Sequence, residues 1–513
     1  MIRNHRGPSV FWWSLLSIVA AAVGVYANSF SGPFIFDDLP TIVENPRIRS
    51  LWPIWRAMSW PAVSSGDGRP IFNLSLALNY ALGGLNVWGY HAVNLALHVV
   101  SAVVLFGLVR RTLGTRRLRE RYGRASLWLS LTVSLWWVAH PLNTESVTYL
   151  TQRTELLMGC CYLLTLYCVV RSAQGRGGSR LWSVGAVIAC AFGMGSKEVM
   201  ISAPVTALLY DRVFLAGSFR QALRKRRSLY LGLASTWLIV GALVATHPHR
   251  HAVGFGFSEL RPWEYAATQL GVVVQYLRLT FWPTPLVIHY DWPVARTLAE
   301  ILPPAIAVGT LACLTVIAFR RRPSLSFLGA WFFLILAPTS SFLPIRTEIA
   351  AERRMYLPLI AVIAAVVLGG YRMAARRWGD RITERRGRRL ALLVLGVFSW
   401  LGALTVVRNE DYRTPESIWR DTVAKQPHSA LAHGNLGVAL VEQDRFEEAI
   451  PHYVEALRLK PDKASTRTNL GVALFYLGRA DEALVHHTEA IRLDPTYLSA
   501  YNNLGVVLIE QER

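Results

Sequence analysis

Charged and aromatic side chains stand together at several points of this chain, each time beside a long apolar stretch. The first group is Phe34-Ile35-Phe36-Asp37-Asp38, shortly after the first such stretch. Two adjacent carboxylates that lose water at a membrane surface cost free energy, so Asp37 and Asp38 indicate a chemical task such as proton transfer. A structural task stays open as well, because an Asp shortly before a proline often caps a turn.

A pair of arginines forms the second group. Arg353 and Arg354 lie in the run Glu352-Arg-Arg-Met-Tyr-Leu-Pro358. Each guanidinium group presents a planar set of N–H donors that matches phosphate oxygens. Ion pairs with Glu348 and Glu352, or contacts with lipid headgroups, are the alternative. The pair therefore predicts an anion-binding position whose anion stays open.

Four shorter polar runs also stand near the ends of apolar stretches. They are His140-Pro-Leu-Asn-Thr-Glu145, Gln152-Arg-Thr-Glu155, Ser196-Lys197-Glu198 and His289-Tyr290-Asp291-Trp292. Charged side chains at the end of a membrane helix often only extend toward water, so the first three runs, each taken alone, favour structural roles. Lys197 and Glu198 have almost no loop around them, which favours burial and mutual pairing. The fourth run is a candidate for contact with a sugar.

Several well-known chemistries have no motif in this chain. There is no P-loop, no GxSxG elbow, no HExxH and no zinc-ligand spacing. The region around Asp37 lacks the repeated Asp-x-Asp spacing of a firmly held divalent cation, so we predict no metal. All five cysteines lie in apolar stretches, which favours small buried hydrophobes over disulfides.

The elements that must position these groups are membrane-spanning helices. The 513 residues are 52% hydrophobic and only 17% charged, and several apolar stretches approach the ~20 residues that cross a bilayer. We predict eleven spans, the first of them an uncleaved N-terminal helix, near residues 10–28, 88–109, 125–140, 155–170, 181–196, 199–213, 229–246, 299–319, 325–341, 355–371 and 390–407.

The formal net charge of +21 is confined to short loops. Six segments hold 28 Arg and Lys but only 3 acids: 1–9, 110–124, 171–180, 217–228, 320–327 and 372–389. Alternate basic loops follow the positive-inside rule, which argues against nucleic-acid binding and predicts that these loops and the N-terminus are cytoplasmic. With eleven spans, the polar groups described above and the C-terminal tail lie on the outer side.

Two further segments belong to that outer side. Residues 262–281 are apolar enough to tempt a twelfth span, but this would move two basic loops outside. We therefore predict a re-entrant or interfacial helix there. The first outer loop, 29–87, is long and rich in Pro, Trp and Asn, and long loops in compact proteins are usually functional.

From about residue 413 the composition becomes that of a soluble domain with an internal repeat. Asn-Leu-Gly recurs at 435, 469 and 503, a period of 34 residues, and prolines at 427, 461 and 495 keep the same period. This is the tetratricopeptide pattern. We predict a membrane domain over 1–410 and repeats over 411–513: full repeats at 429–462 and 463–496 and partial ones at 414–428 and 497–513. An array that ends inside a repeat predicts a natural chain that continues.

In their order along the chain, these motifs resemble those of the transmembrane and tetratricopeptide-repeat O-mannosyltransferases, the group whose animal members modify cadherins. The matching stretches are Asp37-Asp38, Gly68-Arg69-Pro70 with Asn73–Tyr80, His140–Glu145, Ser196–Glu198, Glu352–Pro358 and the repeat tail. The resemblance covers nearly the whole chain. It implies an all-α protein: a polytopic helix bundle with the C-type glycosyltransferase fold, followed by a helical solenoid.

The resemblance also implies an activity. Such enzymes move a sugar, here expected to be mannose, from a polyprenyl-phosphate carrier to an acceptor hydroxyl on the outer face, with inversion. Asp37 or Asp38 would be the base, and the resemblance does not choose between them. The acceptor, a Ser or Thr of a protein by analogy, stays open because this repeat array is shorter than in the animal members.

The chemistry assigns further residues once that activity is assumed. Cations must hold the charge that develops on the leaving phosphate, and Arg353, Arg354, Lys197 or Arg69 could supply them. Supporting or substrate-binding candidates are His140, Glu145, Glu198, His289, Tyr290 and Asp291. The expected partners are the lipid-linked sugar and an acceptor or partner protein bound by the repeats. A bacterial cytoplasmic membrane, with undecaprenyl phosphate or a similar carrier, is the expected location.

Two other functions compete with this one. A scaffold that only anchors the repeats would not need eleven spans or outer carboxylates. A transporter or flippase would be expected to carry ionisable residues in the middle of its spans, whereas here they concentrate at the outer ends.

Overall fold

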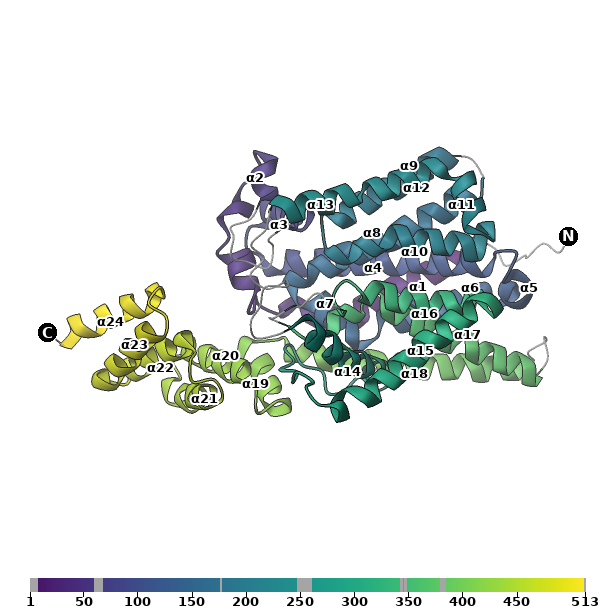
Figure 1. Cartoon of the computed structure of the whole chain (residues 1–513). Coiled ribbons are helices and arrows are strands. Elements are labelled where there is room, and N and C mark those ends of the chain that lie inside the picture. Colours follow the sequence, from purple (N-terminus) through teal and green to yellow (C-terminus); the bar gives the residue numbers. More distant parts are fainter. Residues whose placement is uncertain are drawn as a thin grey trace. The chain divides into compact units, whose positions relative to one another are not determined.

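The structure is a computed structural model that describes residues 8–59, 68–175, 178–246, 261–341, 345, 348–378 and 384–511. Over these residues the protein is all-α, with no β-strand (Figure 1). It divides into two compact units. The membrane unit contains Met1–Leu286 and Pro293–Glu410, and the repeat unit contains Val287–Trp292 and Asp411–Arg513.

The membrane unit contains eighteen numbered α-helices. They are α1 (Pro8–Tyr26), α2 (Ile54–Met58), α3 (Pro70–Gly83), α4 (Val87–Leu113), α5 (Arg119–Tyr122), α6 (Ser126–Val138), α7 (Thr144–Thr148), α8 (Arg153–Ala173), α9 (Ser179–Met194), α10 (Ala203–Tyr210), α11 (Phe219–Lys225), α12 (Arg227–Ser235), α13 (Trp237–Thr246), α14 (Pro262–Phe281), α15 (Leu298–Arg321), α16 (Pro323–Leu336), α17 (Pro358–Trp378) and α18 (Glu384–Asp411), whose last residue belongs to the repeat unit.

Short 3₁₀ or π turns connect many of these helices. They are η1 (Ala27–Ser31), η2 (Leu39–Val43), η3 (Pro46–Arg49), η4 (Gly123–Ala125), η5 (Pro141–Asn143), η6 (Leu150–Gln152), η7 (Glu198–Ser202), η8 (Asp211–Ala216) and η9 (Glu352–Met355). Of these, η5, η6, η7 and η9 contribute residues to the site described below.

Helical segments lie at all eleven predicted spans, but they differ in length. Within the described residues, eight segments are long and apolar enough to cross a membrane: Ser9–Ser31, Val87–Leu113, Leu150–Ala173, Glu198–Ala216, Arg227–Thr246, Leu298–Arg321, Pro358–Trp378 and Arg385–Asp411. The protein is thus an integral membrane protein. The other three predicted spans are the shorter helices α6, α9 and α16.

The short helices leave room for irregular backbone. A helix rises ~1.5 Å per residue, so the 13 residues of α6 cover only ~20 Å of a ~30 Å hydrocarbon layer. α6 ends before His140-Pro141, and α9 ends before Ser196-Lys197. Irregular backbone at membrane depth persists only where protein surrounds it. The runs that start at His140 and Ser196 follow directly after these short helices, so protein must surround them if they lie at membrane depth.

Helix α14 corresponds to the segment predicted to be re-entrant or interfacial, and it is not among the eight candidate spans. Its buried positions, such as Tyr265, Gln269, Val272 and Tyr276, follow helical spacing along one face. This face holds the chain that leads to Arg353. The Gln269 amide donates a hydrogen bond to the Ile349 carbonyl over 2.9 Å, and the Tyr276 hydroxyl accepts one from the Ala351 N–H over 2.9 Å.

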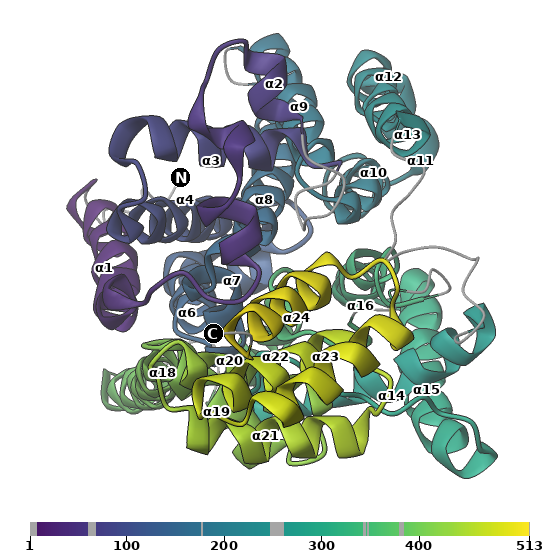
Figure 2. The same ribbon diagram turned by 90° about the vertical axis from the view of Figure 1, so that its left-hand side faces the viewer.

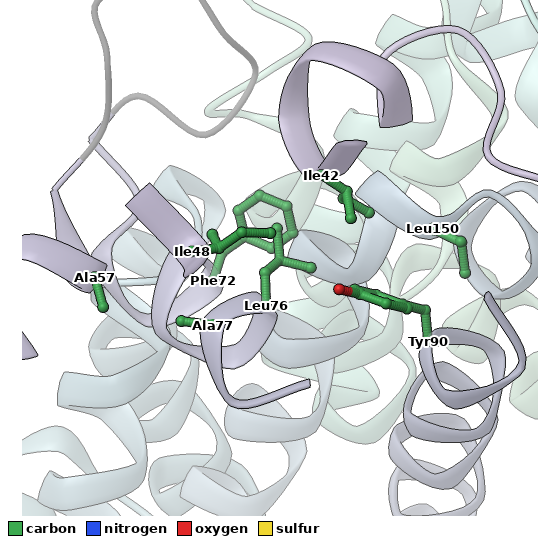
Figure 3. Packing of buried hydrophobic residues seen from close by; sticks show 8 residues of the cluster. All are labelled: Ile42, Ile48, Ala57, Phe72, Leu76, Ala77, Tyr90 and Leu150. Atoms are coloured by element: carbon green, nitrogen blue, oxygen red, sulfur yellow. The ribbon is translucent and has the colours of Figure 1, made fainter. Parts of the chain in front are cut away.

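The first outer loop has its own hydrophobic core. Ile42, Ile48 and Ala57 of the loop pack with Phe72, Leu76 and Ala77 of α3, with Tyr90 of α4 and with Leu150 of η6 (Figure 3). All eight side chains are fully buried. Burying such side chains contributes roughly 1.5–3 kcal/mol each for the larger ones, so the loop is fixed against the helix ends.

The repeat unit stacks antiparallel helices side by side. They are α19 (Pro415–Lys425), α20 (Ala430–Val441), α21 (Phe446–Leu459), α22 (Ala464–Tyr476), α23 (Ala480–Leu493) and α24 (Leu498–Gln511). Figure 2 shows α20 beside α21 and α22 beside α23. A Cβ on Gly437 would come within 2.6 Å of the Tyr453 ring, and one on Gly471 within 2.6 Å of His487. Gly437 and Gly471 are therefore needed where paired helices touch.

Candidate functional site

A buried polar segment follows helix α6 and forms the centre of the candidate site. Every residue from 137 to 156 is buried, although the segment includes five Thr or Ser, two Glu and one Arg. Buried backbone of this kind needs hydrogen-bond partners for its polar groups. His140 supplies two, because its Nε2 donates to the Thr280 carbonyl over 3.0 Å and its Nδ1 accepts from the Leu142 N–H over 3.2 Å. The His140 side chain thus fixes the start of the segment against α14.

Asp38 is held by the same segment. One of its oxygens accepts a hydrogen bond from the Thr151 N–H over 2.8 Å, and the other accepts one from the Ile35 N–H over 3.1 Å. The side chain is fully buried. Burial raises the pKa of the Asp38 carboxyl to about 7, against the opposite effect of these N–H donors, and the nearby charge of Asp37 adds to the rise. Asp38 therefore joins the first outer loop to the buried segment.

Asp37 has a different environment. Its backbone N–H donates to the Tyr149 hydroxyl over 3.0 Å, while its side chain remains partly exposed. The preceding Phe36 has φ 47°, a left-handed conformation that costs a bulky residue free energy. The two adjacent carboxylates differ in burial. One faces the protein interior and the other keeps access to its surroundings.

Arg353 is bound by two carboxylates. Its guanidinium group forms ion pairs with Glu145 and Glu348, and its backbone N–H donates to a Glu145 oxygen over 2.8 Å. Glu145 is buried, and Glu348 is partly exposed. Glu145 lies on α7 and Arg353 on η9, so this contact joins the buried segment to the chain before α17. The ion pair between Arg353 and Glu348, which the sequence analysis gave as an alternative, is present in the structure.

Arg354 is held mainly by backbone and tyrosines. Its guanidinium group donates to the carbonyl of Glu348 and, over 2.9 Å, to the carbonyl of Ile349. Tyr276 and Tyr265 of α14 lie close enough to act on its charge. Arg354 thus positions the chain on either side of Arg353.

Two further ion pairs lie next to Arg353. Lys197 pairs with Glu155 at the start of α8, and Arg69 lies 3.6 Å from Glu198. Lys197 is buried, which lowers the pKa of its ammonium group, while Glu155 favours its charged form. Arg69 and Glu198 keep about a fifth to a quarter of their side-chain surface exposed, at 22% and 25%. The charges of Arg69, Glu198 and Arg353 all act on Lys197, which places these pairs in one electrostatic cluster.

Arg153 is an important residue of the site to which the sequence gave no functional role. It is fully buried and donates to the Asn94 side chain over 2.7 Å, the Asn79 side chain over 2.8 Å and the Tyr90 carbonyl over 3.1 Å. The positive charge of Arg153 and the negative charge of an ionised Asp38 attract each other. The available signal was the run Gln152–Glu155 at the outer end of a span, which the sequence favoured as structural. The buried Arg153 thus joins the start of α8 to helices α3 and α4.

Three further residues that were predicted to support the site do not belong to the membrane unit. His289, Tyr290 and Asp291 belong to the repeat unit, where the Asp291 N–H donates to the Gln426 side chain over 3.0 Å and Tyr290 is buried. Within the described part of the chain, no three His, Cys, Asp or Glu side chains are gathered as a metal-ion site.

The arrangement can perform two chemical tasks. A partly exposed carboxylate, Asp37, can accept a proton, and a cluster of cations around Lys197 can hold an anion. The buried segment contacts both groups, through Tyr149 and Thr151 on one side and through Glu145 and Glu155 on the other.

Two family models match parts of the chain. The sequence model of the family described as dolichyl-phosphate-mannose-protein mannosyltransferase matches residues 67–246. A tetratricopeptide-repeat model matches residues 428–496. The first match includes the buried segment, Arg69, Lys197 and Glu198, and the second lies within the repeat unit.

Similar curated proteins cover both parts. The chain is 28% identical over 501 residues to the protein O-mannosyl-transferase TMTC1 of Homo sapiens, covering 86% of this chain and 55% of that protein. It is 26% identical over 499 residues to the human TMTC4, covering 86% of this chain and 66% of that protein. This chain thus spans between about half and two thirds of the length of these relatives.

A solved structure is also similar. The crystal structure of ArnT from Cupriavidus metallidurans bound to undecaprenyl phosphate aligns with a TM-score of 0.43 and 16% identity, over 93% of this chain and 77% of ArnT.

Proposed function

This chain belongs to the family of transmembrane and tetratricopeptide-repeat O-mannosyltransferases, and on that premise we propose that it transfers mannose from a polyprenyl-phosphate carrier to an acceptor hydroxyl on the outer face of the membrane. The observation that supports the proposal is that the buried segment contacts both the aspartate turn and the cations. Tyr149 and Thr151 bind the turn with the two aspartates, while Glu145 and Glu155 pair with Arg353 and Lys197.

Asp37 is the catalytic base in this proposal. It takes the proton of the acceptor hydroxyl, whose oxygen attacks the anomeric carbon as the bond from that carbon to the phosphate breaks. A single displacement of this kind inverts the configuration at the anomeric carbon. The partial exposure of Asp37 supports this assignment, because both oxygens of the fully buried Asp38 already accept backbone N–H groups. Asp38 is then a positioning residue that keeps the turn in place.

The cations hold the leaving phosphate. Negative charge accumulates on the phosphate as the sugar departs, and fixed cations lower the free energy of that transition state. Arg69 is the foremost candidate for direct contact, since its side chain is partly exposed, at 22%. Lys197, Arg353 and Arg354 are more deeply held by acids and carbonyls. Through these contacts they keep Arg69 and the donor in position.

The membrane and the repeats have distinct tasks. The carrier's lipid chain stays in the bilayer, so the donor must reach the site from the side. The stacked repeats offer a surface for an acceptor protein, with a Ser or Thr hydroxyl as the receiving group, or for a partner protein. His289 and Asp291, in the repeat unit, would contact the acceptor or its sugar, whereas Tyr290 is buried. The proposed location is the cytoplasmic membrane of a bacterium, with the N-terminus in the cytoplasm and the repeats outside.

The proposal is tested by comparing envelope proteins from cells with and without this gene. Mass spectrometry of tryptic peptides should find hexose on Ser or Thr residues only when the gene is present. Re-expression of the wild-type chain should restore the modification, and re-expression of the Asp37→Asn variant should not. Identical glycopeptides in all strains would overturn the proposed activity.

A further inference from the structure

A large cavity lies at the end of the membrane unit away from the aspartates. Its volume is about 1050 Å³, and its walls come from α4, the 110–124 loop, α10, α16 and α17. It meets α4 between Leu105 and Leu113, whereas the buried segment meets α4 near Tyr90 and Asn94. Figure 1 shows α5 near one end of the long helices and α2 and α3 at the other. We call this space the basic cavity.

The walls of the basic cavity are apolar. Leu105 and Leu108 of α4, Phe327 and Trp331 of α16 and Ile360 of α17 line it. A Cβ added at Gly369 or Gly370, which also line it, would meet nothing within 4 Å. A volume near 1000 Å³ is at the upper end of ordinary ligand sites, so the space can hold a phosphate-sized headgroup together with the first part of its hydrocarbon chains.

The lining residues carry charge of one sign. They include six arginines and no Asp or Glu: Arg117, Arg121, Arg321, Arg322, Arg372 and Arg376. These come from three basic loops that are far apart in the sequence. Arg121, Arg376 and Arg322 lie close enough for their charges to act on Arg372. Among the described residues, no carboxylate forms an ion pair with any of the six.

Like charges that gather without acids repel one another, and a bound anion removes that cost. The positive-inside rule accounts for arginines in each loop separately. It does not account for their convergence on one apolar space. Basic pockets between transmembrane helices on the cytoplasmic side are suited to the phosphate headgroups of anionic lipids.

We propose that the basic cavity is a binding site for an anionic glycerophospholipid, whose phosphate lies among Arg121, Arg372 and Arg376 and whose acyl chains lie against the walls from α4, α16 and α17. The occupant is a lipid rather than a free anion because most of the lining is hydrocarbon. This site is separate from the proposed sugar-transfer site and does not depend on it.

The test uses the full-length protein in mixed micelles and native mass spectrometry. Phosphatidylglycerol and phosphatidylcholine with identical acyl chains are offered together, and the bound lipids are counted after delipidation. We expect one phosphatidylglycerol to stay bound with an affinity about tenfold or more above that of phosphatidylcholine. Equal retention of the two lipids would overturn the proposal.

Two variants separate a built site from general attraction to a basic surface. Arg372→Ala with Arg376→Ala should weaken phosphatidylglycerol binding about tenfold or more. Gly369→Leu leaves every charge in place but puts a side chain into the open space, and it should also abolish retention. The matched control is Gly309→Leu on α15, where a Cβ likewise meets nothing and which does not line the cavity. If Gly369→Leu binds phosphatidylglycerol like the control, lipid is attracted only to a basic surface of the protein. This result would overturn the proposed cavity site.

Competition identifies the occupant. Inorganic phosphate at millimolar concentration should not displace the bound phosphatidylglycerol, and an equimolar amount of undecaprenyl phosphate should not replace it. Displacement by phosphate would show a simple anion site, and replacement by undecaprenyl phosphate would show a site for the carrier. Either result would overturn the assignment to a glycerophospholipid.

Discussion

The carboxylate of Asp38 accepts a hydrogen bond from the backbone N–H of Thr151 over 2.8 Å. This contact joins the first outer loop to the buried segment after α6, across more than a hundred residues of sequence. It also divides the tasks of two adjacent aspartates, because Asp37 keeps a partly exposed side chain while Asp38 is fully enclosed. The predictions below begin from this division.

The first prediction separates Asp37 from Asp38. Asp37→Asn should reduce mannose transfer at least ~100-fold, the usual effect of losing a general base, with the unfolding temperature unchanged. Transfer from radiolabelled polyprenyl-phosphate mannose in isolated membranes measures the activity. Asp38→Asn should instead destabilise the protein by ~1–3 kcal/mol at acidic pH, where Asp38 is protonated, since the amide nitrogen leaves one backbone N–H donor without an acceptor. Full turnover by Asp37→Asn would remove the catalytic assignment.

The second prediction concerns pH. The pKa of Asp38 is raised by burial from 3.8 to about 7, so the folded protein binds a proton that the unfolded chain releases above its own pKa. The stability from this group is complete below about pH 4 and is lost as the pH rises to about 7, by as much as ~1.4 kcal/mol per pH unit. The difference in unfolding temperature between wild type and Asp38→Asn should therefore change across this window and be constant above it. A difference that is constant from pH 5 to pH 8 would contradict the assignment.

The third prediction compares two acids that share one arginine. Glu145→Gln leaves Arg353 without its buried partner and should destabilise the protein by ~3 kcal/mol or more. Glu348→Gln is the matched control, because Glu348 is partly exposed and should cost ~1 kcal/mol or less. Thermal unfolding in one detergent measures both. Equal effects would mean that the buried contact between η9 and α7 does not hold the site together.

The fourth prediction tests the proposed phosphate contact. Arg69→Ala should lower kcat for transfer by ~100-fold or more, because a cation that acts mainly on the leaving phosphate stabilises the transition state. Arg69→Lys should recover part of the activity, since it restores the charge without the planar donor set. Arg56→Ala, an exposed arginine of the same outer loop, is the control and should behave like wild type. Activity that survives in Arg69→Ala would move the phosphate contact to another cation.

The fifth prediction concerns the repeat unit. Gly437→Ala places a Cβ within 2.6 Å of the buried Tyr453 ring and should destabilise the repeats by ~1–3 kcal/mol. The same change at Gly505, where nothing lies within 4 Å, should stabilise helix α24 by up to ~1 kcal/mol. Limited proteolysis of the repeats in the full chain measures both. Equal protection of the two variants would contradict close packing at Gly437.

Part of the site could be predicted from the sequence. Carboxylates and arginines beside apolar stretches were visible as candidates, and so was the pairing of Arg353 with Glu348. Lys197 and Glu198, expected to pair with each other, instead form ion pairs with Glu155 and Arg69. The run Gln152–Glu155 was favoured as structural, yet Arg153 binds helices α3 and α4 and Glu155 pairs with Lys197. Which ion pairs form depends on which helix ends lie next to each other, and a local sequence pattern does not contain that information.

The sequence by itself determined that this is a helical membrane protein with a repeat tail. Span length, the sign of loop charges and a 34-residue period are local or periodic properties, and they hold whatever the helices pack against. Only the tertiary structure decided which aspartate is enclosed, which acid binds each cation and that three basic loops surround one cavity. Those outcomes depend on burial and on charges brought together from distant parts of the chain, whose energies exist only after the helices have packed.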